Sequence, residues 1–246
     1  MSHFNEKVRW TLDYKRIPHE RRSVFPGWQP LRARMLRGGT TTLPVIDIDG
    51  TRIGDSTRII EELERRWPDP PLYPSDPGQR QKALELEDFF DEHCAHEVRR
   101  VMFDPLLRER ELMAEASGTQ RRRGSSAVGF LYPVIERAIR RKYSVNPEGV
   151  AEARRTIEAA MDRLERELGP SGYLVGDSFS VADLTAASIL SVLVRPPEFP
   201  YHQVDPARDP EDLKGWRDTL LERPAFKYVL DMYARHRGTS AEVAAA

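Results

Sequence analysis

The alternation of apolar and polar residues divides the chain into two regions of different expected structure. Up to about residue 70, short apolar runs bounded by turn residues alternate with helical periods, whereas from residue 79 onward the helical period continues almost without a break. An α/β segment followed by an all-α segment is typical of two packed domains. We therefore predict an α/β domain over 1–70, a proline-rich linker over 71–78, an all-α domain over 79–238 and a disordered tail over 239–246.

The α/β region is predicted to open directly in a helix. Phe4, Val8 and Leu12 recur at every fourth position, the spacing that places side chains on one helical face. This helix is expected to end at Ile17-Pro18, because the residue before a proline is disfavoured in the α region. Two further elements are expected after it, a strand over 19–25 and a short helix over 31–36.

The clearest local signal is a β-hairpin. Asp49-Gly50 separates two short apolar runs, 45–48 and 51–54, and this dipeptide favours the two-residue turns that join antiparallel strands. Pro44 stands at the entrance of the first run, where a residue without an N–H is tolerated. Residues that can cap a helix follow the second run, so a strand end and a helix start are expected to adjoin. Free N–H groups at such a helix start can hold the charged groups of a small ligand.

Helices account for nearly all of the expected structure after the hairpin. The first is capped by Asp55 or Ser56. It is expected to turn four apolar residues toward the sheet, namely Ile59, Ile60, Leu63 and Trp67. Beyond the linker, helices are predicted over 83–101 with an extension toward 115, and over 128–143, 150–168, 180–193, 213–222 and 225–237.

The helix over 180–193 carries its own start signal. Ser180 can be the N-cap, and Asp183 at the third helical position can return a hydrogen bond to the N–H of the cap. Phe179 and Leu184 occupy the two positions of a hydrophobic staple around this cap. We expect this motif to stabilise the fold and assign it no catalytic role.

Composition and charge exclude several classes of protein. The chain has 246 residues, 39% of them hydrophobic and 31% charged, which suits a packed core under a solvated surface. The net charge of −1 argues against nucleic acid as a partner, and the single cysteine, Cys94, excludes an internal disulfide. No apolar run approaches the roughly 20 residues that cross a bilayer, and the polar start lacks the apolar core of a signal peptide. We therefore expect a soluble, cytoplasmic protein with no membrane partner.

Three motifs, taken in their order along the chain, resemble the glutathione S-transferase family. They are the opening helix from Ser2, the segment 42–57, and the stretch 176–184 that contains the helix cap. The resemblance covers nearly the whole chain. It implies a thioredoxin-like N-terminal domain followed by an all-α C-terminal domain. It also implies glutathione as co-substrate, no metal, and a homodimer.

The resemblance further implies roles for individual residues. Leu43 and a cis Pro44 would receive the cysteinyl backbone of glutathione, and Asp55 and Ser56 would hold its γ-glutamyl end. Ser2, at the start of the first helix, would direct its hydroxyl at the glutathione sulfur and so favour the thiolate. Each role has a structural alternative, because a proline can enter a strand in the trans form and the polar residues can be simple helix caps.

One part of the family pattern is missing. The first domain of the family begins with a β-strand before the helix that starts here at Ser2 or His3, and the sequence holds no residues for that strand. Removing an interior strand would leave two rows of backbone N–H and C=O groups unpaired. We expect a start codon placed too far downstream, with about ten further residues before it. A looser or rebuilt first domain is the alternative.

The C-terminal helices are expected to supply a pocket for an electrophile, near Phe89, Phe90 and His93. The same stretch holds a second possibility. His93, His96 and Glu97 fall on one helical face at i, i+3 and i+4, a spacing that can bind a metal ion. A solvated or interface helix face is the structural alternative for these polar residues.

The sequence thus supports one leading function and two alternatives. The leading interpretation is a transferase in which the glutathione thiolate attacks a small hydrophobic electrophile. The first alternative is a non-catalytic binding or interaction module of the same architecture, favoured by the missing strand and by a serine at the extreme terminus. The second is a metal-dependent or hydrolytic enzyme that uses the histidine cluster.

Overall fold

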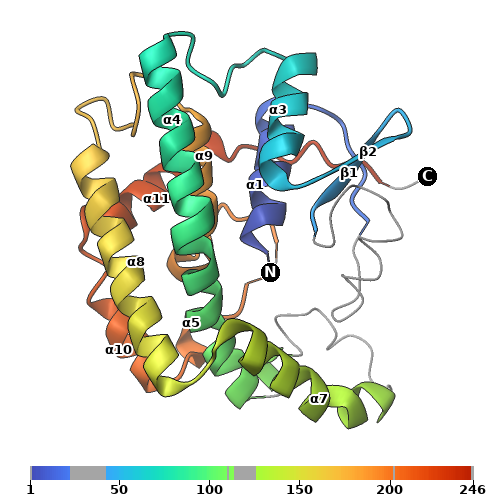
Figure 1. Ribbon diagram of the computed structural model, residues 1–246, viewed down its shortest axis with the longest axis vertical. Coiled ribbons are helices and arrows are strands. Elements are labelled where there is room, and N and C mark those ends of the chain that lie inside the picture. Colours follow the sequence, from blue (N-terminus) through green and yellow to red (C-terminus); the bar gives the residue numbers. More distant parts are fainter. Residues whose placement is uncertain (1, 23–42, 110, 114–125, 202, 245–246) are drawn as a thin grey trace.

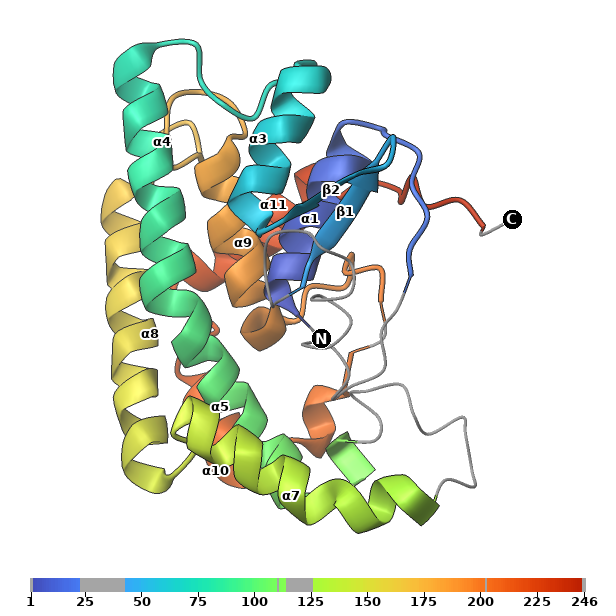
Figure 2. The same cartoon turned by 45° about the vertical axis from the view of Figure 1, so that its right-hand side comes forward.

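Helix α1 (His3–Tyr14) lies between a β-hairpin and a bundle of helices in the computed structural model (Figures 1 and 2). The structure describes residues 2–22, 43–109, 111–113, 126–201 and 203–244. On one side α1 packs against α3 (Ser56–Arg66), which also contacts both strands of the hairpin. On the other side it packs against α9 (Val181–Val194), a helix in the middle of the bundle. The first helix therefore joins the two parts of the molecule.

The hairpin pairs β1 (Val45–Ile48) with β2 (Thr51–Gly54) in an antiparallel register that sets Val45 opposite Gly54. Both residues of the connecting Asp49-Gly50 turn have positive φ, 52° and 81°, as a type I′ turn requires. The predicted hairpin is confirmed in place and length. Within the described residues these two strands form the only sheet.

The bundle is built from helices in the order that the sequence predicts. They are α4 (Pro77–Phe89), a π-helical turn η1 (Phe90–Cys94), α5 (Ala95–Arg108), α7 (Ser126–Tyr143), α8 (Pro147–Glu167), α9, a 3₁₀ turn η3 (Pro206–Arg208), α10 (Glu211–Asp218) and α11 (Pro224–His236). The segments α4, η1 and α5 follow one another as a long rod that packs on α8 and α9, while α7 extends from α5 at one end of the molecule (Figure 1).

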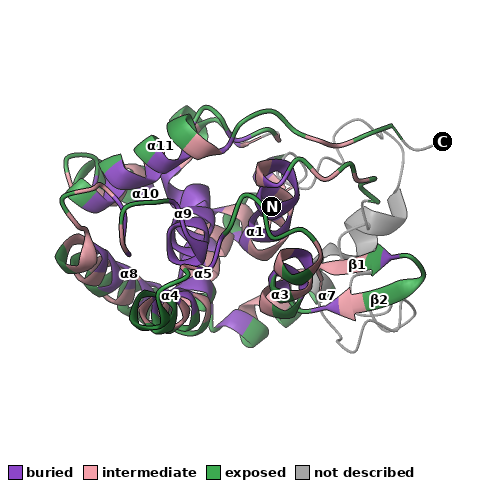
Figure 3. Cartoon of the chain, turned by 90° about the horizontal axis from the view of Figure 1, so that it is seen from above, coloured by how far each residue is buried: buried purple, intermediate pink, exposed green. Residues whose placement is uncertain are grey.

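Helix α9 forms the centre of the hydrophobic core, and all of its residues are buried (Figure 3). Its predicted start signal is confirmed. The Asp183 carboxylate accepts hydrogen bonds from the Ser180 N–H at 2.9 Å and from the Leu174 N–H at 2.8 Å. The Tyr228 hydroxyl donates to the same carboxylate at 2.6 Å. A helix that is apolar on all sides is stable only when surrounded, and this cap ties its start to two neighbouring segments.

The segment after α11 folds back onto the amino-terminal part of the chain. The buried Arg237 guanidinium lies 2.6 Å from Glu6 Oε1 and 2.7 Å from Asp13 Oδ2. Further along, His19 forms an isolated parallel bridge with Glu242. The prediction of a disordered tail is therefore wrong for residues 239–244, because carboxylate and backbone partners near the amino terminus hold this segment.

Two other predicted elements fall wholly or partly outside the described residues. The helix expected over 31–36 lies outside them, as does the end of the strand expected over 19–25. In the described part of that strand, His19 bridges to the carboxy-terminal segment and residues 20–22 take no strand conformation. Among the described helices, none combines the length and the apolar composition needed to span a membrane.

Candidate functional site at one end of the hairpin

The hairpin brings the two predicted binding dipeptides to the same place. Because Val45 pairs with Gly54, Leu43-Pro44 enters and Asp55-Ser56 leaves at one end of the hairpin. The Leu43–Pro44 peptide bond is cis, as predicted. Asp55 is also the N-cap of α3. The backbone of one segment, the side chains of the other and the start of a helix are therefore neighbours.

Helices α1 and α3 run in the same direction. The start of α1 therefore lies on the same side as the start of α3 and the end of the hairpin that holds Pro44 and Asp55. Near their starts, Lys7 and Thr57 contact the same two carboxylates from the rod. Near their ends, Lys15, the residue directly after α1, reaches Glu64 of α3 at 2.6 Å. The first turns of both helices, with Ser2 before α1, therefore lie on the same side, at the lower ends of α1 and α3 in Figure 1. Helix N-termini present unpaired N–H groups and positive potential, so this end suits anionic groups.

A buried ionic cluster fixes these helix starts against the rod. Lys7 Nζ lies 2.7 Å from Glu87 Oε1 and 2.6 Å from Asp91 Oδ2, and the Lys7 side chain is 0% exposed. The Thr57 hydroxyl donates to the same two oxygens at 3.1 and 3.3 Å. Burial raises the pKa of Glu87 and of Asp91. Sequence reasoning missed this cluster, because Lys7 is 80 and 84 positions from its two partners.

Asp55 holds an unusual backbone conformation at the predicted site. Its φ of 77° is uncommon for a residue other than glycine and costs about 1–3 kcal/mol. Oδ1 accepts hydrogen bonds from the N–H groups of Thr57 and Arg58 at 3.1 and 3.2 Å, so the expected cap is formed. The side chain is exposed, and within the described residues Oδ2 has no hydrogen-bond or ionic partner. It can accept from a ligand's ammonium.

Ser56 occupies the first position of α3 and is largely buried. In the part of the chain that the structure describes, neither its backbone N–H nor its hydroxyl donates to an acceptor. Two donors at the start of one helix can bind both oxygens of a carboxylate.

Ser2 precedes α1 as its N-cap residue, with φ −137° and ψ 115°. Its carbonyl accepts from the Glu6 N–H at 3.0 Å, but its hydroxyl makes no capping hydrogen bond. Ser2 therefore caps α1 through its backbone carbonyl and not through its side chain. The hydroxyl stays able to donate to another group at this end of α1.

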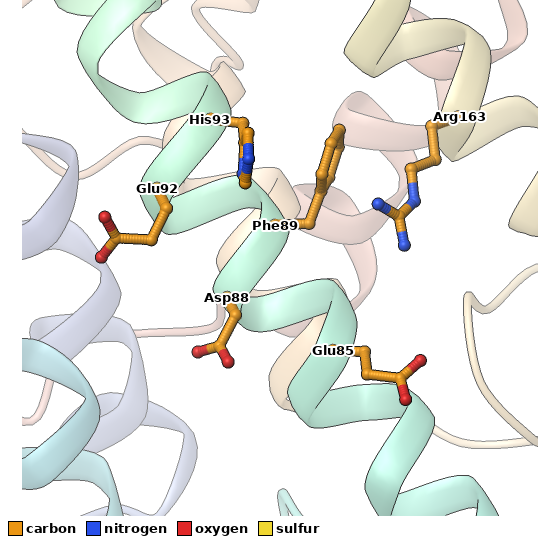
Figure 4. Close-up of a pocket in the computed structure, with 6 residues that line it drawn as sticks. All are labelled: Glu85, Asp88, Phe89, Glu92, His93 and Arg163. Atoms are coloured by element: carbon orange, nitrogen blue, oxygen red, sulfur yellow. The ribbon is translucent and has the colours of Figure 1, made fainter.

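The three residues predicted for the electrophile pocket do not form one site. Phe90 is 0% exposed in the core, so its assignment to a pocket is wrong. Phe89 and His93 line an open groove of about 550 Å³ toward α8 (Figure 4), with their rings stacked at 5.3 Å and the Arg163 guanidinium 4.1 Å from the Phe89 ring centre. Glu87, two positions before Phe89, contacts α1 instead. Two residues turn a helix by about 200°, so this groove lies away from α1.

The histidine cluster does not assemble a metal site. His93 stacks on Phe89, whereas Glu97 pairs with Arg100 at 2.7 Å and lies 3.5 Å from His96. The π-helical turn that contains His93 also breaks the regular i, i+3, i+4 spacing. Nowhere in the described residues do three His, Cys, Asp or Glu side chains converge as metal ligands would.

Two family models match the chain in the order of its two parts. The model of the glutathione S-transferase N-terminal domain matches residues 1–71, and the model of the glutathione S-transferase C-terminal domain matches residues 147–219. The chain belongs to the glutathione S-transferase family. Its fold is a thioredoxin-like N-terminal domain followed by an all-α domain, as predicted.

The chain is similar to proteins that bear different names. FtsZ-localized protein A of Caulobacter vibrioides is 24% identical over 230 residues, covering 92% of this chain and 86% of the relative. Protein LigF of Sphingobium is 26% identical over 198 residues, covering 78% and 75%. The crystal structure of beta-etherase LigF from Sphingobium aligns with a TM-score of 0.60 at 22% identity, covering 94% and 95% of the two chains. The structural likeness shows the fold, and none of these likenesses selects one activity.

Proposed function

We propose that this protein binds glutathione at the hairpin end and uses its thiolate to attack a small hydrophobic electrophile. The observation that carries the proposal is the convergence of Leu43-Pro44, Asp55-Ser56 and the starts of α1 and α3. Family membership supports glutathione as the ligand. The proposal includes a cytoplasmic homodimer, as for the family that the motifs resemble.

The site offers a complementary group for each part of the γ-glutamyl end of glutathione. Ser56, whose N–H and hydroxyl have no acceptor among the described residues, binds the α-carboxylate. Oδ2 of Asp55 accepts from the ammonium. The extended backbone at Leu43 and Pro44 then receives the cysteinyl main chain.

Ser2 acts on the sulfur in this proposal. A free thiol has a pKa of about 8.5 and is mostly protonated at neutral pH. A hydroxyl that donates to the sulfur, together with the positive end of α1, favours the thiolate and so raises the fraction of nucleophile. The thiolate then displaces a leaving group or adds to an electron-poor carbon.

Calorimetric titration of the full chain with glutathione tests the proposal. We expect saturable binding that weakens about ten- to hundredfold in Ser56→Ala, because the hydroxyl's hydrogen bond to a charged group is lost. Ser75→Ala is the matched control, since Ser75 is an exposed serine in the segment before α4. Absence of glutathione binding to the unmodified protein would refute the proposal.

A non-catalytic binding or interaction module is the second candidate function. The similarity to FtsZ-localized protein A, which extends over 92% of this chain, favours it. The same titration separates the two candidates, because a module of this kind needs no glutathione. Incubation with glutathione and a chromogenic electrophile then tests catalysis directly.

A further inference from the structure

Arg99 on α5 carries a charge that no carboxylate neutralises within the described residues. Its NH1 donates to the Tyr143 hydroxyl at 3.1 Å, and its NH2 lies 3.1 Å from His3 Nε2. The next residue, Arg100, pairs with Glu97 at 2.7 Å. Arg99 is partly exposed, so it brings an unpaired cation to the start of α1.

His3 directly follows Ser2 and is 2% exposed. A guanidinium can only donate, so Nε2 of His3 accepts the hydrogen bond from Arg99. Burial, together with the charge of Arg99, holds the pKa of His3 well below its ordinary value. The ring is therefore neutral, and its single proton is on Nδ1.

Among the described residues, the three side chains of this cluster offer several donors. Arg99 keeps three N–H groups beyond the two bonds described. Tyr143 accepts from Arg99, so its own hydroxyl proton is free to bind an acceptor. His3 adds its Nδ1–H. Lys142 reinforces the positive potential, with Nζ 5.4 Å from the Tyr143 ring centre. A set of donors around an unpaired guanidinium is complementary to an anion.

Aromatic rings surround the same guanidinium. The Arg99 carbon Cζ lies 5.5 Å from the ring centres of both Phe4 and Tyr143. Phe103 packs beside Tyr143, with ring centroids 5.0 Å apart. Phe4 and Phe103 are only partly buried, so apolar ring surface remains next to the cation. A flat aromatic molecule that bears a negative group matches both features.

We propose that Arg99, together with Tyr143 and His3, binds the carboxylate of an aromatic electrophile. The inference rests on the proposed function for the reaction itself, because Ser2 is the residue next to His3. Arg99 is then a specificity-determining residue that orients the substrate while the thiolate attacks its ring or side chain.

Equilibrium binding tests the inference without any need for catalysis. The full chain is titrated with 3-nitrobenzoate and with its neutral amide, 3-nitrobenzamide. We expect the benzoate to bind at least tenfold more tightly, and Arg99→Gln to remove this preference. Arg155→Gln is the control, because it removes one positive charge from an exposed position of α8 and should keep the preference.

Tyr143→Phe provides a second variant if Arg99→Gln folds poorly, as judged by circular dichroism. Loss of its hydroxyl should lower the preference while the ring remains. Equal binding of benzoate and amide by the unmodified protein, no detectable benzoate binding, or an unchanged preference in both variants would overturn the inference.

A kinetic comparison separates this inference from the proposed function. With glutathione present, 4-chloro-3-nitrobenzoate should react faster than its amide in the unmodified protein and not in Arg99→Gln. Conjugation of both substrates at equal rates would overturn the inference alone. Failure to bind glutathione, with the benzoate preference intact, would overturn the proposed function alone.

Discussion

The Lys7 ammonium lies 2.6 Å from the Asp91 carboxylate, and the Lys7 side chain is fully buried. Lys7 belongs to α1 and Asp91 to η1, so this pair crosses from the α/β part of the molecule to the helical part. Glu87 shares the same ammonium at 2.7 Å. This buried cation is therefore one of the contacts that fix the proposed glutathione site relative to the bundle.

Replacing this cation should destabilise the fold strongly. Lys7→Met leaves two buried carboxylates without their partner, and breaking a buried ion pair in this way costs about 3–5 kcal/mol. Urea unfolding at neutral pH measures the loss. Lys82→Met is the control, because the Lys82–Glu167 pair is partly exposed and should contribute less than about 1 kcal/mol. Similar losses for the two variants would show that the buried cluster has no special role.

Asp55→Asn should separate ligand binding from stability. Asparagine caps a helix about as well as aspartate, so the free energy of unfolding should change little. The lost charge should weaken glutathione binding about ten- to hundredfold, because the ammonium loses a charged acceptor. Asp76→Asn makes the same change at the N-cap of α4 and should leave calorimetric affinity unaltered. An Asp55→Asn protein with full affinity would remove Asp55 from the site.

Ser2→Ala should impair chemistry and leave the fold intact. The Ser2 hydroxyl makes no capping hydrogen bond, so its removal should not alter unfolding. If it stabilises the thiolate, kcat/KM should fall about ten- to hundredfold, and the thiol of bound glutathione should ionise at higher pH, as followed by thiolate absorbance.

Ser180→Ala gives the opposite pattern and serves as the control. Its hydroxyl donates to Asp183 at 2.7 Å at the start of α9, and loss of such a cap typically costs about 1 kcal/mol. Unfolding should therefore shift while the ionisation of bound glutathione stays the same. If Ser2→Ala unfolds more easily and the thiol of bound glutathione ionises at the same pH, then Ser2 acts only as the cap of α1.

His3 should make stability fall in mild acid. Burial lowers the pKa of His3 in the folded state below the ordinary value of 6.5, so below that pH the unfolded chain binds more protons. The free energy of unfolding should therefore drop as the pH falls from 6.5 through the folded-state pKa. His3→Gln removes this component. The difference between the two proteins, measured by urea unfolding from pH 8 to pH 5, should shrink as the pH falls.

The two proteins are compared by difference because other titrating groups change the free energy of unfolding in the opposite direction. Burial raises the pKa of Glu6 and Glu87, and such carboxyls gain stability as the pH falls through their folded-state values. These contributions are common to both proteins and cancel in the difference. Ser75→Ala, at an exposed serine that does not titrate, should run parallel to the unmodified protein. A parallel curve for His3→Gln would contradict the prediction.

The elements that could be predicted are those whose cause is local. The Asp49-Gly50 turn adopts positive φ at both residues. This turn type sets the hairpin register, which places Pro44 and Asp55 at the same end of the hairpin. The helix cap at Ser180 and Asp183 uses residues three positions apart. Apolar spacing likewise located the helices, because each helix must bury one face.

Residue roles that depend on partners far along the chain could not be predicted. Phe89 and Phe90 are adjacent, yet only the packing of η1 decides that Phe90 enters the core while Phe89 lines the groove beside Arg163. The sequence around the carboxy terminus shows no local partner pattern, because the partners of this segment lie far away along the chain. Asp13, for example, is 224 positions from Arg237.

By itself, then, the sequence determined the hairpin, its register, the helices and the motif at the hairpin end, since hydrogen bonds and apolar periods within a few residues specify them. Only the tertiary structure decided that Lys7 is buried between two carboxylates and that Arg99 meets His3. A charge leaves water only when another part of the chain supplies its partner, and no local pattern records where that partner will be.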